Sequence, residues 1–129
     1  MIKPEYREIL EKEGNEKILE IDGYDCKILR VGMEYSGHLC GYVKIPETHR
    51  IYNLDYDDID VNVHGGLTYA SEKKDGYWIG FDCAHYHDVV PCVVGSFLDL
   101  DRFNEGTYKD MQYVEKELIR LVRQIKALA

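Results

Sequence analysis

The stretch TYKDMQYVEKELIRLVRQIKAL, residues 107–128, decides the fold class. Its apolar residues recur at spacings of three and four, which is the period of one face of an α-helix. These residues are Met111, Val114, Leu118, Leu121, Ile125 and Leu128. Thr107 is placed to cap the helix, and Asp110 three residues later gives a weak variant of the capping box. The pattern predicts a long amphipathic helix that covers a sheet or dimerises, and packing on a sheet is favoured.

Residues 17–45 supply the first strands of that sheet. KILEIDGYDCKILRVGM (17–33) contains two short apolar runs around Asp22–Gly23, which is a typical hairpin turn. HLCGYVKI (38–45) reads as a third strand that ends at Pro46. Before them, KPEYREILEKEG (3–14) predicts a short helix, with Pro4 in its first turn and Gly14 as its stop signal.

Further strands are predicted around residues 61–83. VNVHGGLTYA (61–70) suggests a Gly65–Gly66 hairpin that pairs Val63 with Thr68, and YWIGFDC (77–83) reads as a central aromatic strand. The fold class is therefore α+β: an antiparallel sheet of about five strands, a short N-terminal helix and a long C-terminal amphipathic helix packed on the sheet. We expect one globular domain over residues 1–129, because this length suits a single core.

The charge of the chain restricts its partners. With 24 Asp and Glu against 16 Lys and Arg, the formal net charge is −8 at pH 7. A field of this sign repels phosphate backbones, so direct nucleic-acid binding is disfavoured. It favours a basic protein surface instead, although solubility alone also explains an acidic domain.

The acidic charge gathers in DYDDID (55–60), within a polar, tyrosine-rich stretch that we expect to be an exposed loop. The candidate partner-binding residues are Tyr52, Asp55, Tyr56, Asp57, Asp58 and Asp60. A solvated loop without a partner is the alternative. Calcium binding has less support, because the glycine and the terminal glutamate of an EF-hand loop are missing.

The N-terminal residues MIKPEYREILEKEG are charged and contain no apolar signal segment. No run approaches the roughly 18 apolar residues that a membrane span needs. We therefore expect a cytoplasmic protein that does not bind membranes and whose thiols stay reduced. A monomer and a homodimer are both compatible with the sequence.

The nine residues GFDCAHYHD (80–88) hold the densest set of metal-binding side chains. Cys83, His85 and His87 alternate, so in an extended chain they project to one face about 6.5–7 Å apart. Thiolate and imidazole are ligands that zinc prefers, and a short kink would bring two or three of them onto one ion. His64, beside Gly65–Gly66, is the first choice for a further ligand, and we expect Asp82 or Asp88 to ligate the ion or to orient an imidazole. The pattern predicts a structural zinc site, although no CxxC pair supports a zinc finger.

Two other interpretations of the same residues remain open. In the first interpretation, Cys83 is an apolar core residue, and His85 and His87 face water. In the second, Cys83 is a thiol nucleophile paired with His64 or His85. The second interpretation is weaker, because no helix begins after the cysteine to stabilise a thiolate. His38 and Cys40 in HLCG are explained as well by a half-buried strand as by a second ligand pair.

The combination of HLCGYV, VHGGLTYA, GYWIGFDCAH and GTYKDMQYVEKEL resembles a group of small proteins encoded in phages and prophages of Gram-positive bacteria. The similarity covers about residues 36–120. The resemblance implies a phage protein acting in the cytoplasm of an infected bacterial host. Small acidic phage proteins often counter host defences, and some anti-CRISPR proteins inhibit Cas nucleases in this way.

Together with the acidic charge, this resemblance implies a non-enzymatic inhibitor of an immune effector such as a Cas9-type nuclease. The acidic loop would bind a basic surface that the effector needs for guide or target. One alternative is a small metal- or thiol-dependent hydrolase that uses the 64/83/85/87 group. A second is a sponge that sequesters a nucleotide signal, and the net charge of −8 counts against it.

Overall fold

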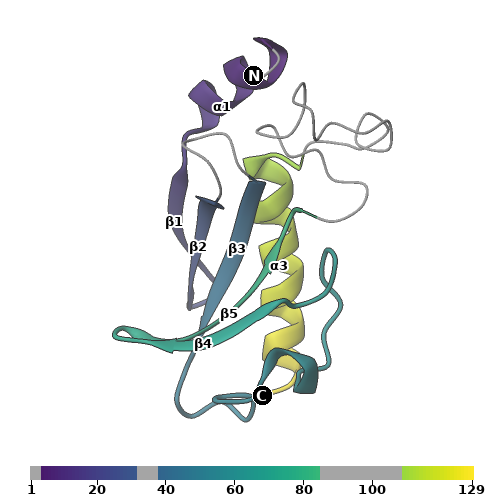
Figure 1. Ribbon diagram of the computed structural model, residues 1–129. Helices are drawn as coiled ribbons and strands as arrows, with labels where there is room; N and C mark the ends of the chain where they lie inside the picture. Colours follow the sequence, from purple (N-terminus) through teal and green to yellow (C-terminus); the bar gives the residue numbers. More distant parts are fainter. Residues whose placement is uncertain (1–3, 32–37, 85–108) are drawn as a thin grey trace.

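The computed structural model describes residues 4–31, 38–84 and 109–129 (Figure 1). Within them, five antiparallel strands form one sheet, with one helix beyond its end and a second helix along one face. The elements in chain order are α1 (Pro4–Glu13), β1 (Glu16–Ile21), β2 (Tyr24–Val31), β3 (His38–Ile45), the 3-10 helix η1 (Tyr56–Asp58), β4 (Tyr69–Lys73), β5 (Gly76–Asp82) and α3 (Met111–Ala127). The predicted α+β architecture is confirmed.

The sheet has the strand order β1-β2-β3-β5-β4, so β5 lies between β3 and β4. The β1–β2 hairpin turns at Asp22 and Gly23, whose φ angles of 50° and 86° are both positive, as a type I′ turn requires. This hairpin was predicted from the sequence. The prediction that the aromatic strand is central is also confirmed, since the residues from Tyr77 to Phe81 on β5 are all buried.

Helix α3 covers one face of the sheet and completes the core (Figure 1). Its buried apolar residues are Met111, Val114, Leu118, Leu121, Val122 and Ile125. All but Val122 belong to the predicted stripe, and its last member, Leu128, caps the helix at its C-terminus. The predicted cap was wrong: Asp110 is the N-cap, and its Oδ1 accepts the N–H of Tyr113 at 2.8 Å. Thr107 lies outside the described residues.

The sheet and α3 pack closely at a residue without a side chain, Gly41. Gly41 on β3 pairs with Phe81 on β5, and the Phe81 ring occupies the space over the glycine. A Cβ at position 41 would lie 2.8 Å from two ring atoms of Phe81 and 3.1 Å from Cγ1 of Val114. Both Phe81 and Val114 are almost fully buried. The glycine therefore sets the packing distance between the sheet and the helix.

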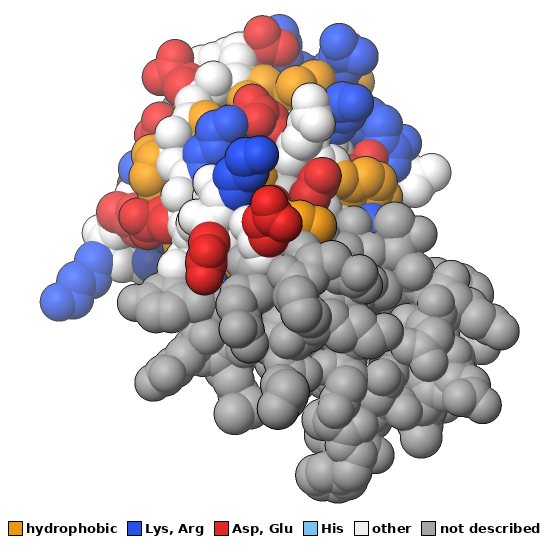
Figure 2. Space-filling model, turned by 90° about the horizontal axis from the view of Figure 1, so that it is seen from above, with side chains coloured by type: hydrophobic (Ala, Val, Ile, Leu, Met, Phe, Trp, Pro, Cys, Tyr) orange, Lys and Arg blue, Asp and Glu red, His pale blue; other side chains and the backbone are white. Residues whose placement is uncertain are grey.

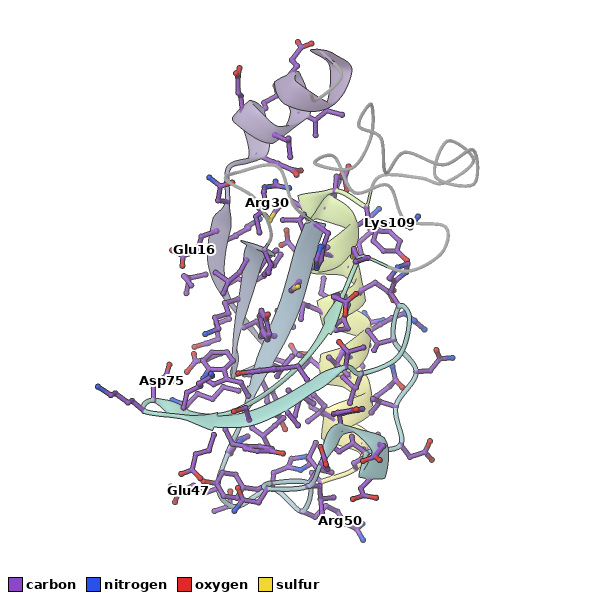
Figure 3. All side chains as sticks on the ribbon, viewed as in Figure 1. Glu16, Arg30, Glu47, Arg50, Asp75 and Lys109 are labelled. Carbon is purple, nitrogen blue, oxygen red and sulfur yellow. The ribbon has the colours of Figure 1, made fainter. Side chains whose placement is uncertain are left out.

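A buried arginine joins α1, the sheet and α3 at the N-terminal end of α3. The Arg30 side chain on β2 is 1% exposed, and its guanidinium lies near the start of α3 (Figure 3). Its Nη2 donates to Oε1 of Glu13 at 2.7 Å and to the carbonyl of Gly14 at 2.9 Å. Its Nε donates to Oδ1 of Asn15 at 3.1 Å, while Oε2 of Glu13 accepts the N–H of Met111 at 3.0 Å. This network ties the end of α1 to the sheet and to α3.

The predicted Gly-Gly hairpin is wrong. Val63 lies outside any strand, and the N–H of Thr68 donates to the carbonyl of Gly80 on β5 instead of pairing with Val63. Gly65 and Gly66 do form a tight turn, because the N–H of Gly66 donates to the carbonyl of Val63 at 2.8 Å. The backbone of Asn62 and His64, in the segment before this turn, hydrogen-bonds to α3. This segment therefore does not form a strand of the sheet.

Candidate functional site

The loop of residues 47–60, here called the acidic loop, wraps around the C-terminal end of α3 (Figure 1). It was predicted to be exposed throughout, but His49, Ile51 and Ile59 are buried. Nε2 of His49 lies 2.8 Å from the carbonyl oxygen of Ile125, and Nδ1 accepts the N–H of Ile51 at 3.2 Å. Because a carbonyl only accepts, these contacts fix the neutral tautomer with its hydrogen on Nε2. The histidine therefore anchors the acidic loop to the last turn of α3.

The outer side of the acidic loop carries its charge. Asp57, Asp58 and Asp60 are exposed, and Asp55 caps η1 by accepting the N–H of Tyr56 at 2.9 Å. Beside these carboxylates, the side chains of Leu54 and Tyr56 are also exposed, at 37% and 42%. Glu47 also lies on this loop and points outward (Figure 3). The predicted partner-binding aspartates and Tyr56 are thus all exposed within six consecutive residues of the loop.

The remaining predicted partner-binding residue is placed differently. Tyr52 is half-buried, packs against the core and lies 5.5 Å from the Tyr77 ring, measured between ring centroids. The hydroxyl of Tyr77 in turn donates to the carbonyl of Leu54. These two tyrosines support the acidic loop from the sheet side, while His49 supports it from the helix side.

The chain then runs along α3 toward its N-terminal end. The N–H of Asn62 donates to Oε1 of Gln124 at 2.6 Å, and Gln124 returns a bond to the carbonyl of Asn62 at 2.8 Å. Further along, the N–H of His64 donates to Oε1 of Glu117 at 2.8 Å. The His64 ring is hydrogen-bonded through Nδ1 to the hydroxyl of Tyr113 at 2.7 Å. A segment without regular structure is thereby fixed along its length.

Glu117 gives this attachment a dependence on pH. Burial raises the pKa of its carboxyl, but the bonds from Arg120 and from the N–H of His64 outweigh burial, so that the pKa lies below its ordinary value of 4.5. A carboxylate with a lowered folded pKa adds stability that is complete above pH 4.5 and is lost as the pH falls further. We expect Glu117→Gln to flatten the fall in unfolding free energy below that pH, measured by urea denaturation.

The matched control for this prediction is Glu115→Gln on the same helix. Glu115 pairs with Lys17 at 2.7 Å, but both side chains are well exposed, at 35% and 45%. Water and salt screen such a pair, so the acid dependence should follow that of the unchanged protein. A Glu117→Gln protein with an unchanged acid dependence would contradict the assignment.

The predicted zinc ligands are only partly within the described residues. Cys83 is 2% exposed and belongs to the core. Asp82 points to the other face of the sheet, where Oδ2 accepts the hydroxyl of Thr68 at 2.9 Å and Oδ1 accepts the N–H of Ala84 at 3.1 Å. His64 is bonded to α3, as described above. His85 and His87 lie outside residues 4–31, 38–84 and 109–129, and within those ranges no three His, Cys, Asp or Glu side chains group to hold a metal. The zinc site stays a prediction.

The thiols of the sheet have little nucleophilic character. Burial raises the pKa of Cys26 to about 12 and that of Cys40 to about 11, so both thiols are protonated at neutral pH. Cys83 is as deeply buried as Cys26. These environments offer no support for the alternative of a thiol hydrolase.

Sequence reasoning missed two residues that build this region, His49 and Glu117. No local signal marks His49, since its partner Ile125 is 76 positions away in the chain. Glu117 has one recognisable sign: it is a charged residue directly beside Leu118, on the edge of the apolar stripe of α3. A carboxylate at such an edge must find a hydrogen-bond donor, because burial without one is costly.

No helix of the described segments is long and apolar enough to span a membrane. In comparisons with protein-family models, with curated proteins and with solved structures, no significant match to this chain was found.

Proposed function

We propose that this protein is a non-enzymatic inhibitor whose acidic loop binds a basic, nucleic-acid-handling surface of an immune effector, such as a Cas9-type nuclease, in a phage-infected bacterial cell. The single observation that carries the proposal is the two-sided construction of the loop. Its buried side chains fasten it to α3 and the sheet, while its carboxylates all face outward. Such a surface competes with phosphate groups for the same lysines and arginines.

Rigidity supports a role in binding. His49 and Tyr77 hold the backbone of the acidic loop from two sides, so little conformational entropy remains to be lost when a partner docks. Leu54 and Tyr56 add exposed apolar area next to the exposed aspartates. Protein interfaces usually combine apolar and polar surface in this way.

The distribution of charge elsewhere agrees with this assignment. On the face seen in Figure 2, basic and acidic side chains lie side by side over the described part of the chain. The six residues from Asp55 to Asp60, by contrast, contain four aspartates and no Lys or Arg, and Arg50 is the one basic residue besides His49 earlier in the acidic loop. The acidic loop is therefore a feature of local sequence rather than a consequence of the net charge.

The test is a charge reversal of the loop. We expect Asp57→Lys combined with Asp58→Lys to lower the affinity for a Cas9-type nuclease by at least about tenfold, because two attractive contacts become repulsive. The affinity of the unchanged protein for the nuclease should fall as salt is added. The unchanged protein should also inhibit DNA cleavage at a one-to-one ratio with the nuclease. Titration calorimetry at two salt concentrations and a cleavage assay measure these quantities.

Glu8→Lys combined with Glu11→Lys is the matched control, since both residues are exposed on α1 and the change in net charge is the same. This variant should bind nearly as well as the unchanged protein. Equal affinity of the loop variant and the unchanged protein would contradict the role of the acidic loop. An absence of any inhibition by the unchanged protein would contradict the choice of a Cas9-type target.

A further inference from the structure

The face of the sheet opposite α3 carries a cluster of aromatic and basic side chains. The strand register places them together, since Lys27 pairs with Tyr42, and Gly80 pairs with both Tyr42 and Tyr69. On the same face, Trp78 lies opposite Lys44 and Ser71. The cluster is separate from the acidic loop, which lies at the C-terminal end of α3 (Figure 1).

These side chains surround a cavity of about 230 Å³, here called the lysine–tyrosine cavity. Its lining residues are Lys27, Leu29, Tyr42, Tyr69, Lys73 and Trp78. The Tyr42 ring packs over Gly80, where a Cβ would lie 2.5 Å from Cδ1 of the ring. The rings of Tyr42 and Tyr69 meet edge to face with their centroids 5.3 Å apart. The cavity is thus shaped by the backbone and by packed rings.

The two lysines of the cavity contact rings rather than carboxylates. Nζ of Lys27 lies 4.3 Å from the centroid of the Trp78 ring and 5.7 Å from that of Tyr42. Nζ of Lys73 lies 5.6 Å from the centroid of the Tyr69 ring. Among the ion pairs of the described residues, none involves either lysine. Two positive charges therefore remain at the cavity without a negative partner in contact.

The pKa values of the two tyrosines of the cavity shift in opposite directions. Burial raises the pKa of Tyr69, but the bonds from Lys73 and Ser71, with the charges of Lys73 and Lys27, outweigh burial and lower it. Burial raises the pKa of Tyr42, so its hydroxyl is a neutral donor at pH 7. The cavity offers two ammonium groups and two phenol hydroxyls, all of which donate hydrogen bonds.

We propose that the lysine–tyrosine cavity binds the phosphate of a small phosphate monoester that also carries a flat ring, a nucleoside monophosphate in its simplest form. A phosphate monoester bears about −1.5 to −2 charges at pH 7, which matches the two lysines. Its three terminal oxygens accept bonds from the ammonium groups and from the phenol hydroxyls. A ligand with a carboxylate in place of the phosphate would carry only about half of this charge, and it would leave some of the ammonium and hydroxyl donors of the cavity without an acceptor.

The flat ring has a place beside the phosphate. A second cavity of about 330 Å³ shares Lys27 and Trp78 with the first and is also lined by Asp25, Lys44 and Asp75. The carboxylates of Asp25 and Asp75 in this second cavity can accept hydrogen bonds from the sugar hydroxyls or base amino groups of a nucleotide. A phosphate group has no such donors. The Trp78 indole is held in position by a bond from Nε1 to Oδ1 of Asp75 at 3.0 Å.

Trp78 is the only tryptophan of the chain, so its fluorescence reports directly on the site. We expect AMP and GMP to change this fluorescence with saturation, and adenosine and inorganic phosphate to bind at least about tenfold more weakly, because each lacks one half of the contacts. Lys27→Gln combined with Lys73→Gln should weaken AMP binding by at least about tenfold. Lys74→Gln, at an exposed neighbour outside either cavity, should leave it unchanged.

Thermal melting of each variant separates loss of binding from loss of folding, and Tyr69→Phe gives a milder change at the same site. The proposal is overturned if neither nucleotide changes the fluorescence at millimolar concentration. It is also overturned if adenosine or phosphate binds as well as AMP, or if the lysine variants bind normally. None of these results bears on the acidic loop, whose test uses other residues and another partner.

Discussion

Replacing Arg30 by alanine is expected to lower the free energy of unfolding by about 3–5 kcal/mol, a large share of the 5–15 kcal/mol typical of a domain. The guanidinium is 1% exposed and bonds Glu13, Gly14 and Asn15. Its removal leaves the Glu13 carboxylate, which is only 12% exposed, without that cation. Urea denaturation with an unchanged m-value measures the loss.

The control is Lys17→Ala, which breaks an ion pair of the same 2.7 Å length on the surface. Exposed pairs contribute no more than about 1 kcal/mol, so this variant should remain close to the unchanged protein. Arg30→Lys should fall between the two, because it keeps the charge but loses the planar fork of donors. If Arg30→Ala cost no more than Lys17→Ala, the network between α1, the sheet and α3 would have no structural importance.

The second large effect concerns the contact between Phe81 and Gly41. Phe81→Ala is expected to cost about 3–5 kcal/mol, because the ring is 1% exposed and its removal leaves a cavity in the core. Gly41→Ala is expected to cost about 1–3 kcal/mol for the opposite reason, since its Cβ would lie 2.8 Å from the ring. The two substitutions therefore disturb the same space in opposite directions.

Their combination provides the sharper result. In the double variant the new methyl group at position 41 enters the space that the ring has left, so the total cost should be smaller than the sum of the single costs. Alanine also suits a strand interior better than glycine does. Denaturation curves of the two single variants and the double variant measure this coupling. Additive costs would contradict the contact seen in the structure.

The elements of the sheet and of α3 could be predicted because their signals are local. The spacing of Met111, Val114 and Leu118 is enough for an amphipathic helix, and Asp22–Gly23 is enough for a hairpin. The cap of α3 was misplaced because Thr107 and Asp110 are both good caps, and only the backbone geometry distinguishes them. Gly65–Gly66 was misread because the same two glycines serve a hairpin or an isolated turn.

The candidate sites could be predicted less well, because they depend on distant pairings. The aspartates of the acidic loop were recognised from composition, but the anchor His49 bonds a carbonyl 76 residues away. The lysine–tyrosine cavity was missed because Lys27 and Lys73 come from strands that never pair with each other. The net charge of −8 argued against any anion site, whereas a bound anion responds to the charges that line its cavity.

The position of α3 in the chain has a consequence for how the protein is made. All five strands of the described residues are synthesised before the helix that covers the sheet, and the contacts of Glu13 with Met111 and of Lys17 with Glu115 each span 98 residues. Until α3 leaves the ribosome, the apolar side of Ile28, Val43 and Phe81 lacks the cover that this helix provides, and such surfaces aggregate or recruit chaperones. Folding is therefore completed after translation of the sheet, and its rate is set by long-range closure rather than by the local hairpins.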